Sequence, residues 1–399
     1  MCSELVMDLT RLKQQHKDQA RDWSGLPLDL VKKISDNLSI YDYLCFSNVC
    51  KSWRSYQEET LQRNRGSPWL LMFKGGEAET LSCISLPEKN KLWQLEMPTF
   101  TEAQIWGCIE DWLIITKPFR ESTSIKMSLL NPFTQTQVVL TGTFNVEHKL
   151  VFSGDPGKQS CVYVLYDSMR VNVWIPEAKA WYHYDFDEDM HDDEDIIDLI
   201  CFKGCFYILS EDYNIHVLET VCTDTTIQTE GYKNDIDLQC YEIEMSPDIQ
   251  REIQILRYLV EFGDEILLVV RFLRNDFNET CDFKVFRLDM CKKKWVELDS
   301  LGDCVIFLGR NCSRCYSAKE LWGGDDKGNC IYFTNDCALR NSMGRDIQLS
   351  CSVEKDDWGI FRLNSEGGSE RFSYIAKQGK RPPVWITVPL WWHFNTFRP

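Results

Sequence analysis

A repeated pair of short strands is the sequence feature that most constrains how this chain can fold. Each copy has an alternating strand that ends in an aliphatic residue, a polar turn of about five residues and a second apolar or aromatic strand. The copies span residues 81–97, 125–140, 171–185, 215–231 in a degraded form, 283–299 and 358–374. In the first four copies the aliphatic residues are Leu86, Leu130, Ile175 and Leu218, at intervals of about 43–45 residues. This period is typical of a four-stranded blade of a β-propeller.

A second element lies between these copies and completes a four-stranded unit. It is a pair of apolar strands around a short acidic or glycine turn, and it occurs at residues 105–116, 199–210 and 259–270. We expect this pair to form the inner half of a blade and the repeated pair to form the outer half. The sequence therefore predicts an all-β domain, most simply a β-propeller of six blades. A seventh blade within the longer intervals before Leu288 and Leu363 is one alternative, and a β-sandwich or irregular β domain is another.

The chain before residue 66 has apolar residues at helical spacing instead. Leu30, Ile34 and Leu38 are four residues apart, which places them on one stripe of a helix. Pro27 suits the first turn of this helix, because the N–H that proline lacks would have no partner there. The spacing predicts an amphipathic helix that opens at Leu26-Pro27.

Two further short helices are expected after the first, because Ser39 and Asn48 can each cap one. A domain of about 40 residues buries only a thin core and usually needs a metal, a disulfide or a partner to stay folded. No metal motif lies in this part, so the sequence implies a partner. We expect a helical or flexible extension at residues 1–22, a small all-α domain of three short helices at 23–62 and the β domain at 66–399.

The N-terminal pattern resembles the F-box signature. The resemblance rests on Leu26-Pro27, the spaced aliphatic residues and the run Val49-Cys50-Lys51-Ser52-Trp53-Arg54. It implies binding to a Skp-type adaptor and, through it, to a cullin. By this resemblance the adaptor-binding residues are Leu26, Pro27, Leu30, Ile34, Leu38, Leu44, Val49, Cys50 and Trp53.

The rest of the chain resembles the C-terminal domain of unknown function in a large family of plant F-box proteins. Residues 283–336, the stretch LLNPFTQTQ at 129–137 and PVWITVP at 383–389 carry the likeness. It implies a propeller-like partner-binding domain without established chemistry. The expected function is therefore that of a non-catalytic substrate-recognition subunit of a Skp–cullin–F-box (SCF) ubiquitin-protein ligase, which binds an unknown protein target. One alternative is a ligand- or glycan-binding module that acts without ubiquitin transfer, and a weaker one is a hydrolase in the propeller channel.

Charge and composition narrow the partners. The formal net charge of −17 disfavours nucleic acid, because duplex binding draws on a surplus of Lys and Arg. No run of eighteen apolar residues and no signal-peptide pattern is present, so we expect no membrane partner and a location in the nucleus, the cytoplasm or both. In such a compartment the 18 cysteines are expected to be reduced thiols.

Three further segments contain residue types that can form a binding site. The nine carboxylates between Asp185 and Asp198 fit a solvated loop better than a dock for a basic partner. Cys312 and Cys315 have zinc-like spacing without a second pair nearby in the sequence, and residues 154–158 fit a turn better than a phosphate loop. The six histidines lie in no recognised nucleophile motif. The sequence therefore predicts no metal, no cofactor and no catalytic site.

Overall fold

The apolar and aromatic runs of the sequence form 25 strands in the described part of the computed structural model. The residues that the structure describes are 25–35, 38, 46, 49–50, 53, 67–72, 80–86, 91–96, 104–118, 125–144, 149–156, 158, 161, 163–166, 170–175, 180–185, 196–219, 238–245, 254–274, 279–309, 311, 313–322, 328–334, 357–363, 370–371 and 384–389.

The strands form four sheets of four strands and one sheet of nine. In sheet order, the four-stranded sheets contain β25 (Val384–Val388), β1 (Ser67–Met72), β2 (Thr80–Ser85) and β3 (Lys91–Glu96); β4 (Gln104–Ile109), β5 (Trp112–Pro118), β6 (Ile125–Leu130) and β7 (Gln137–Phe144); β11 (Ala180–Asp185), β10 (Arg170–Ile175), β9 (Tyr163–Tyr166) and β8 (Lys149–Phe152); and β12 (Ile196–Phe202), β13 (Cys205–Ser210), β14 (Ile215–Glu219) and β15 (Leu238–Tyr241).

The nine-stranded sheet is built from two groups of strands. Its order is β19 (Lys294–Leu298), β18 (Glu279–Asp289), β17 (Glu265–Arg274), β16 (Gln254–Phe262), β21 (Arg314–Ser317), β20 (Cys304–Leu308), β22 (Cys330–Phe333), β23 (Gly359–Arg362) and β24 (Glu370–Arg371). β16 and β21 join the two groups through a single parallel pair, Glu261 with Arg314. The other neighbouring strands of this sheet pair over two or more residues.

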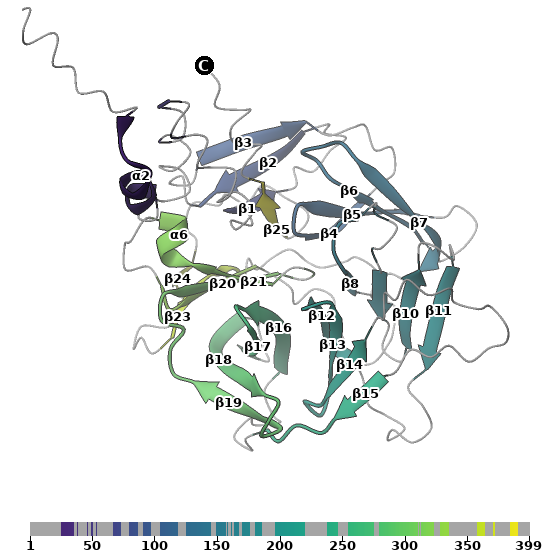
Figure 1. The fold of residues 1–399 in the computed structure, drawn as a ribbon. Helices are drawn as coiled ribbons and strands as arrows, with labels where there is room; N and C mark the ends of the chain where they lie inside the picture. Colours follow the sequence, from purple (N-terminus) through teal and green to yellow (C-terminus); the bar gives the residue numbers. More distant parts are fainter. Residues whose placement is uncertain are drawn as a thin grey trace, which may run out of the picture.

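The sheets are arranged in a ring, as expected for a β-propeller (Figure 1). β4, β8, β12 and β16 lie toward the centre, whereas β7, β11, β15 and β19 lie toward the outside. In agreement, β12 contacts both β8 and β16, and β25 contacts β4. β25 pairs with β1, with Val388 opposite Ser67, so the last strand of the chain completes the first sheet.

The predicted strand pairs can be compared with the sheet order. The three predicted inner pairs are β4–β5, β12–β13 and β16–β17. Five of the six repeated pairs are confirmed as the hairpins at the outer ends of the sheets: β2–β3, β6–β7, β10–β11, β18–β19 and β23–β24. For the degraded copy at 215–231, the predicted second strand was wrong. β14 pairs with β15, so residues 220–237 lie between the two strands where a short turn was expected.

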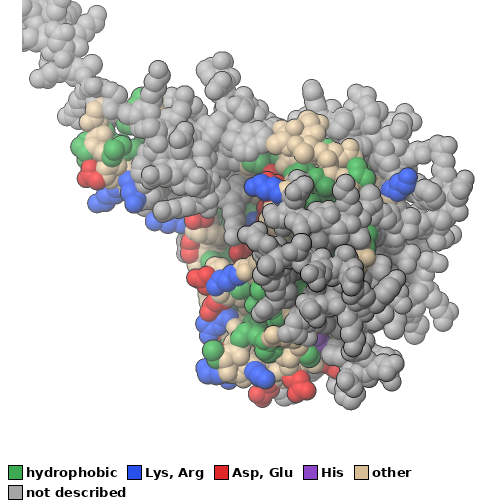
Figure 2. Space-filling view, turned by 45° about the vertical axis from the view of Figure 1, so that its right-hand side comes forward, with side chains coloured by type: hydrophobic (Ala, Val, Ile, Leu, Met, Phe, Trp, Pro, Cys, Tyr) green, Lys and Arg blue, Asp and Glu red, His purple; other side chains and the backbone are tan. Residues whose placement is uncertain are grey.

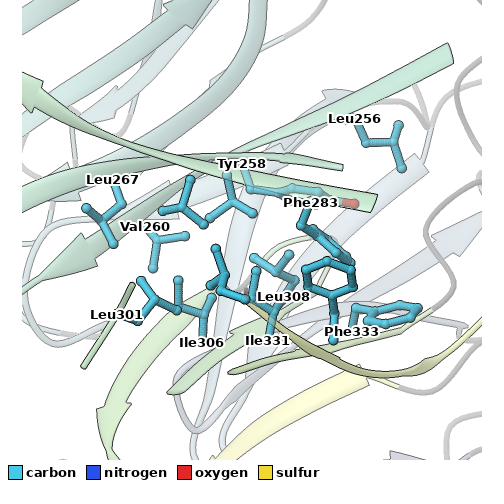
Figure 3. Close-up of a cluster of buried hydrophobic side chains, with 14 of the residues drawn as sticks. Leu256, Tyr258, Val260, Leu267, Phe283, Leu301, Ile306, Leu308, Ile331 and Phe333 are labelled. Atoms are coloured by element: carbon cyan, nitrogen blue, oxygen red, sulfur yellow. The ribbon is translucent and has the colours of Figure 1, made fainter. Parts of the chain in front are cut away.

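The core consists of apolar side chains packed between neighbouring sheets. One cluster joins Val151, Val164 and Val173 to Leu199 and Phe206 of the next sheet. A larger cluster fills the space between the two halves of the nine-stranded sheet, and Figure 3 shows Val260 and Leu267 facing the Ile306 and Ile331 side. Each sheet thus buries its faces against its neighbours, which is how a ring of sheets forms a continuous core.

Two helices are described. α2 (Leu28–Ser35) lies outside the ring, and α6 (Ala318–Trp322) follows β21 (Figure 1). The second and third helices that we expected from the caps Ser39 and Asn48 lie outside the described residues.

Candidate protein-binding surface

Helix α2 begins directly after Pro27. The Pro27 carbonyl accepts hydrogen bonds from the backbone N–H groups of Leu30 and Val31, both at 3.0 Å. Proline therefore supplies the first acceptor of the helix, and its missing N–H costs nothing because the first N–H groups of a helix have no partner within it. Asp29 in the first turn and Lys32 in the last turn complement the helix dipole. These local features explain why the helix forms where the Leu-Pro pair predicts it.

The helix buries a narrow face and exposes its larger aliphatic residues. Val31 is 1% exposed, and Ser35, four residues later, is also buried. By contrast Leu28 is 62%, Leu30 44% and Ile34 41% exposed. Large apolar side chains left in water on one small element mark an interaction surface more often than an accident of folding.

The other predicted adaptor-binding residues that can be placed are partly or fully accessible. Val49 is 60% exposed and Pro27 is also exposed, whereas Leu26, Leu38, Cys50 and Trp53 are half-buried. The Trp53 ring stacks on Phe46 with ring centroids 4.3 Å apart, which holds the indole in place. Leu44 lies outside the described residues.

Two residues of this helix were missed by the sequence reasoning. Leu28 is the most exposed large apolar residue of α2, although it falls outside the stripe of Leu30, Ile34 and Leu38. Val31 is the buried anchor of the helix, although it was assigned no role. The available signal was the amphipathic period, which fixes which residues share a face but not which face meets the rest of the domain.

Figure 2 shows hydrophobic side chains next to basic and acidic ones on the coloured lobe at the upper left. α2 contributes Asp29, Lys32 and Lys33 to this region beside its exposed aliphatic residues. An apolar patch with charged neighbours can bind an apolar protein surface and set its orientation through the rim. In chemical terms the surface is suited to recognition.

The acidic stretch is not entirely a loop, because Asp185 ends β11 and Asp198 lies on β12. Asp198 is buried on β12, where it pairs with the Lys149 ammonium at 2.6 Å and accepts the Leu259 N–H at 2.7 Å. The expectation of a solvated carboxylate was therefore wrong for Asp198, which holds inner strands together. Residues 186–195 lie outside the described residues.

The cysteine motif and the glycine turn can also be placed. Cys315 lies on β21, whereas Cys312 lies outside the described residues. Among the described residues no group of three or more His, Cys, Asp or Glu side chains is arranged to hold a metal ion. Gly154 has a positive φ of 77°, and Lys158 donates its N–H to the Asp155 carbonyl, so this segment is a turn, as predicted.

No helix in the described residues is long and apolar enough to cross a membrane.

Comparison with known proteins identifies two regions. Residues 83–362 match the family model described as the KIB1-4 beta-propeller, and residues 23–57 match the F-box domain. The F-box/kelch-repeat protein At1g57790 of Arabidopsis thaliana is 26% identical, and the alignment covers 79% of this chain and 84% of that protein. The F-box protein At3g56470 of the same plant is 23% identical over 94% of this chain and 91% of that protein. The F-box protein SKIP23 is 24% identical, with 92% and 96% covered.

Proposed function

The chain belongs to the F-box proteins that carry a KIB1-4 β-propeller, and on this basis we propose that it is the substrate-recognition subunit of an SCF ubiquitin-protein ligase. In this role the F-box binds a Skp-type adaptor and, through it, a cullin. The propeller binds a protein target. The chain itself breaks no bond.

The observation that carries the proposal is the outward orientation of the aliphatic residues of α2. Leu28, Leu30 and Ile34 are exposed while Val31 is buried, so the helix keeps its larger apolar side chains available to a partner. Covering a leucine that is about half exposed contributes on the order of 1 kcal/mol. Several such residues together support an adaptor interface of useful affinity.

The proposed interface contains the residues of the F-box signature and one addition. Leu28 joins them because it is exposed on the same helix. The proposed adaptor-binding set is therefore Leu26, Pro27, Leu28, Leu30, Ile34, Leu38, Leu44, Val49, Cys50 and Trp53. The F-box domain would occupy residues 23–62, after an extension at 1–22.

For the target-binding domain, residues 66–399, we propose six blades. The nine-stranded sheet supports this count, because both of its ends are outer hairpins and its two halves meet at one residue pair. Four separate sheets and two joined ones then give six units around the ring. The F-box would attach at the edge where β1 begins, beside the β4–β5 turn, because the Thr387 N–H of the neighbouring β25 bonds to the Glu110 carbonyl at 2.8 Å.

The proposed mechanism is scaffolding. A target held by the propeller gains a high effective concentration near the ubiquitin-conjugating enzyme that the cullin recruits, so that lysine modification becomes an intramolecular event. The outer strand of one sheet ends, and the inner strand of the next begins, at the edge of the ring opposite the F-box attachment. Loops that join blades are where propellers bind partners. We place the target on that edge.

Adaptor capture tests the proposal. The full-length chain should co-purify with a Skp-type adaptor, and the double variant Leu30→Asp with Ile34→Asp should lose at least about tenfold in capture because it puts charge into an apolar contact. Leu92→Asp is the matched control, since Leu92 is an exposed leucine on β3 of the propeller. Absence of capture by the wild type, or equal capture by the double variant, would contradict the proposal.

Ubiquitin transfer separates the proposal from its alternative. If the chain captures the adaptor, a reconstituted complex with cullin and a conjugating enzyme should modify a protein bound by the propeller. A ligand-binding module without transfer would capture its ligand equally well with or without the F-box double substitution, and its bound protein would remain unmodified.

A further inference from the structure

Two cysteines lie close together on the β20–β21 hairpin. Cys315 is opposite Ile306, and Cys304 is opposite Ser317, so the cysteines are diagonal neighbours across the two strands. Because side chains alternate along a strand, Cys304 and Ile306 point to the same face, and Cys315 shares it. Both thiols pack against the cluster that contains Ile306 and Leu301, part of which Figure 3 shows.

The two thiols are chemically different. Both are free and half-buried. A hydrogen bond from the Cys315 thiol lowers the pKa of Cys304, and the same contact, together with burial, raises the pKa of Cys315. Since the thiolate is the reactive form of cysteine, Cys304 is the better nucleophile and Cys315 is a thiol held beside it.

We propose that Cys304 and Cys315 form a peroxide-sensitive thiol pair, in which Cys304 is oxidised first and Cys315 then closes a reversible disulfide. In the first step the Cys304 thiolate attacks hydrogen peroxide, an S–O bond forms as the O–O bond breaks, and the hydroxide that leaves is protonated to water. In the second step the Cys315 sulfur attacks the Cys304 sulfenic acid, and the S–S bond forms with loss of a second water. Two thiols are thus oxidised and one peroxide is reduced.

The diagonal placement explains why this bond is suited to a switch. A disulfide requires Cα atoms less than about 7 Å apart, and diagonal pairs of an antiparallel ladder lie near that limit. The bond therefore forms with some distortion of the hairpin, and disulfides of this kind are the ones that are readily reduced. A reducing compartment would return the pair to two thiols.

The β20–β21 hairpin contacts other sheets of the ring, so its distortion would alter those contacts. Arg314, next to Cys315, pairs with Glu110 in the β4–β5 turn and forms the strand contact with Glu261 of β16. Asn311, in the same hairpin, packs against Gly107 of β4. A bond between the two cysteines would thus act on contacts that link β21 to two other inner strands.

Other cysteines provide internal controls. Cys201 and Cys205 are closer in sequence, but Cys201 is opposite Phe206 and Cys205 is opposite Phe202, so they point to opposite faces of the sheet. Accordingly they pack in two different clusters. Cys291 is exposed in the β18–β19 turn, so it should react with peroxide without forming a link to Cys304 or Cys315.

The test is peptide mapping of the reduced full-length protein after graded treatment with hydrogen peroxide. We expect a linked peptide that joins Cys304 to Cys315 and disappears on addition of dithiothreitol. It should form at peroxide doses that yield no Cys201–Cys205 link. In Cys315→Ser, Cys304 should stop at the sulfenic acid and be trapped by a dimedone probe, whereas in Cys304→Ser the Cys315 thiol should remain unlabelled.

Three results would overturn the proposal: no Cys304–Cys315 peptide in the wild type, a Cys201–Cys205 link formed at the same or lower dose, or no labelling of Cys304 in Cys315→Ser. The wild-type map does not depend on any variant folding. Circular dichroism of both serine variants shows whether a missing label reflects an unfolded chain, and if so Cys315→Ala replaces Cys315→Ser.

Discussion

The Lys149 ammonium lies 2.6 Å from the Asp198 carboxylate, and both side chains are buried. Asp198 also accepts the backbone N–H of Leu259 at 2.7 Å. Lys149 belongs to β8, Asp198 to β12 and Leu259 to β16, so one carboxylate connects the inner strands of three successive sheets. A buried ion pair that is also hydrogen-bonded is expensive to break from one side, because a charge remains without its partner.

Asp198→Ala should therefore destabilise the propeller by about 3–5 kcal/mol in urea unfolding. The control is Asp264→Ala, which removes the partner of Lys203 in an exposed pair and should cost less than about 1 kcal/mol. Equal losses in the two variants would show that Asp198 contributes no more than a surface charge.

Arg271 makes a second buried ionic contact, between β17 and the segment that precedes β23. Its guanidinium is fully buried, donates to Asp357 at 2.7 Å and to the Thr334 carbonyl at 2.9 Å, and lies over the Phe333 ring. Arg271→Met should cost about 3–5 kcal/mol, because Asp357 would remain buried. In a double-mutant cycle with Asp357→Asn the losses should be clearly non-additive, and additive losses would argue against direct coupling.

Gly107 leaves room for Asn311. A Cβ at Gly107 would lie 2.1 Å from the Asn311 Nδ2, and neither side-chain amide atom of Asn311 has a hydrogen-bond partner within the described part of the chain. Gly107→Ala should therefore destabilise the protein by about 1–3 kcal/mol. In an Asn311→Ala background the same substitution should cost less than about 0.5 kcal/mol. A cost unchanged by that background would place the strain elsewhere.

Leu28 and Val31 are close in sequence but should respond differently to substitution. Leu28→Asp should reduce adaptor capture about tenfold and leave the unfolding midpoint unchanged, because Leu28 is exposed in the free chain. Val31→Ala should lower the stability of the F-box domain by about 1–3 kcal/mol, because Val31 is buried. Capture and unfolding measured on both variants check this, and a large midpoint shift for Leu28→Asp would contradict it.

Asp111 should make stability depend on pH. Burial raises the pKa of its carboxyl above the ordinary value, and Glu110 adds to this, although Asn131 and Arg314 act in the opposite direction. The folded state then binds the proton more tightly than the unfolded state, so this stabilisation is full below about pH 4 and is lost as pH rises through the folded pKa. Asp111→Asn should remove this dependence, so the free energy of unfolding of the variant should increase relative to that of the wild type as pH rises. Unfolding experiments across pH 4–7 measure the difference in stability between the variant and the wild type. A difference that does not change with pH would contradict the prediction.

The hairpins of the ring were predictable because their alternation is local. The strands around Leu130 and Leu288 pair as the repeat implies, since a short polar turn fixes the register of its own two strands. The copy at 215–231 failed for the same reason: β14 finds its partner beyond residue 237, so no short turn signals the pair. Long connections of this kind remove the period from the sequence without removing the strand from the sheet.

The buried charges could not be read from the sequence. Asp198 looks like its acidic neighbours, and Arg271 like any charge on a strand, because their partners are 49 and 86 residues away. The exposure of Leu28 and the burial of Val31 likewise depend on how α2 sits in its domain. The local pattern of apolar residues predicts whether a segment forms a strand or a helix. The pairing of distant charges depends on how the strands are arranged in the completed ring.

The pairing of β25 with β1 has a consequence for how the protein is made. During synthesis the F-box and every sheet from β4 onward emerge before residues 384–388. β1 therefore lacks its inner neighbour until almost the whole propeller has left the ribosome. The nascent ring is an open arc with an unpaired strand edge at one end, which is the state in which chaperone binding would matter most. A premature stop before residue 384 would leave the chain permanently in that state, with helix α2 already made.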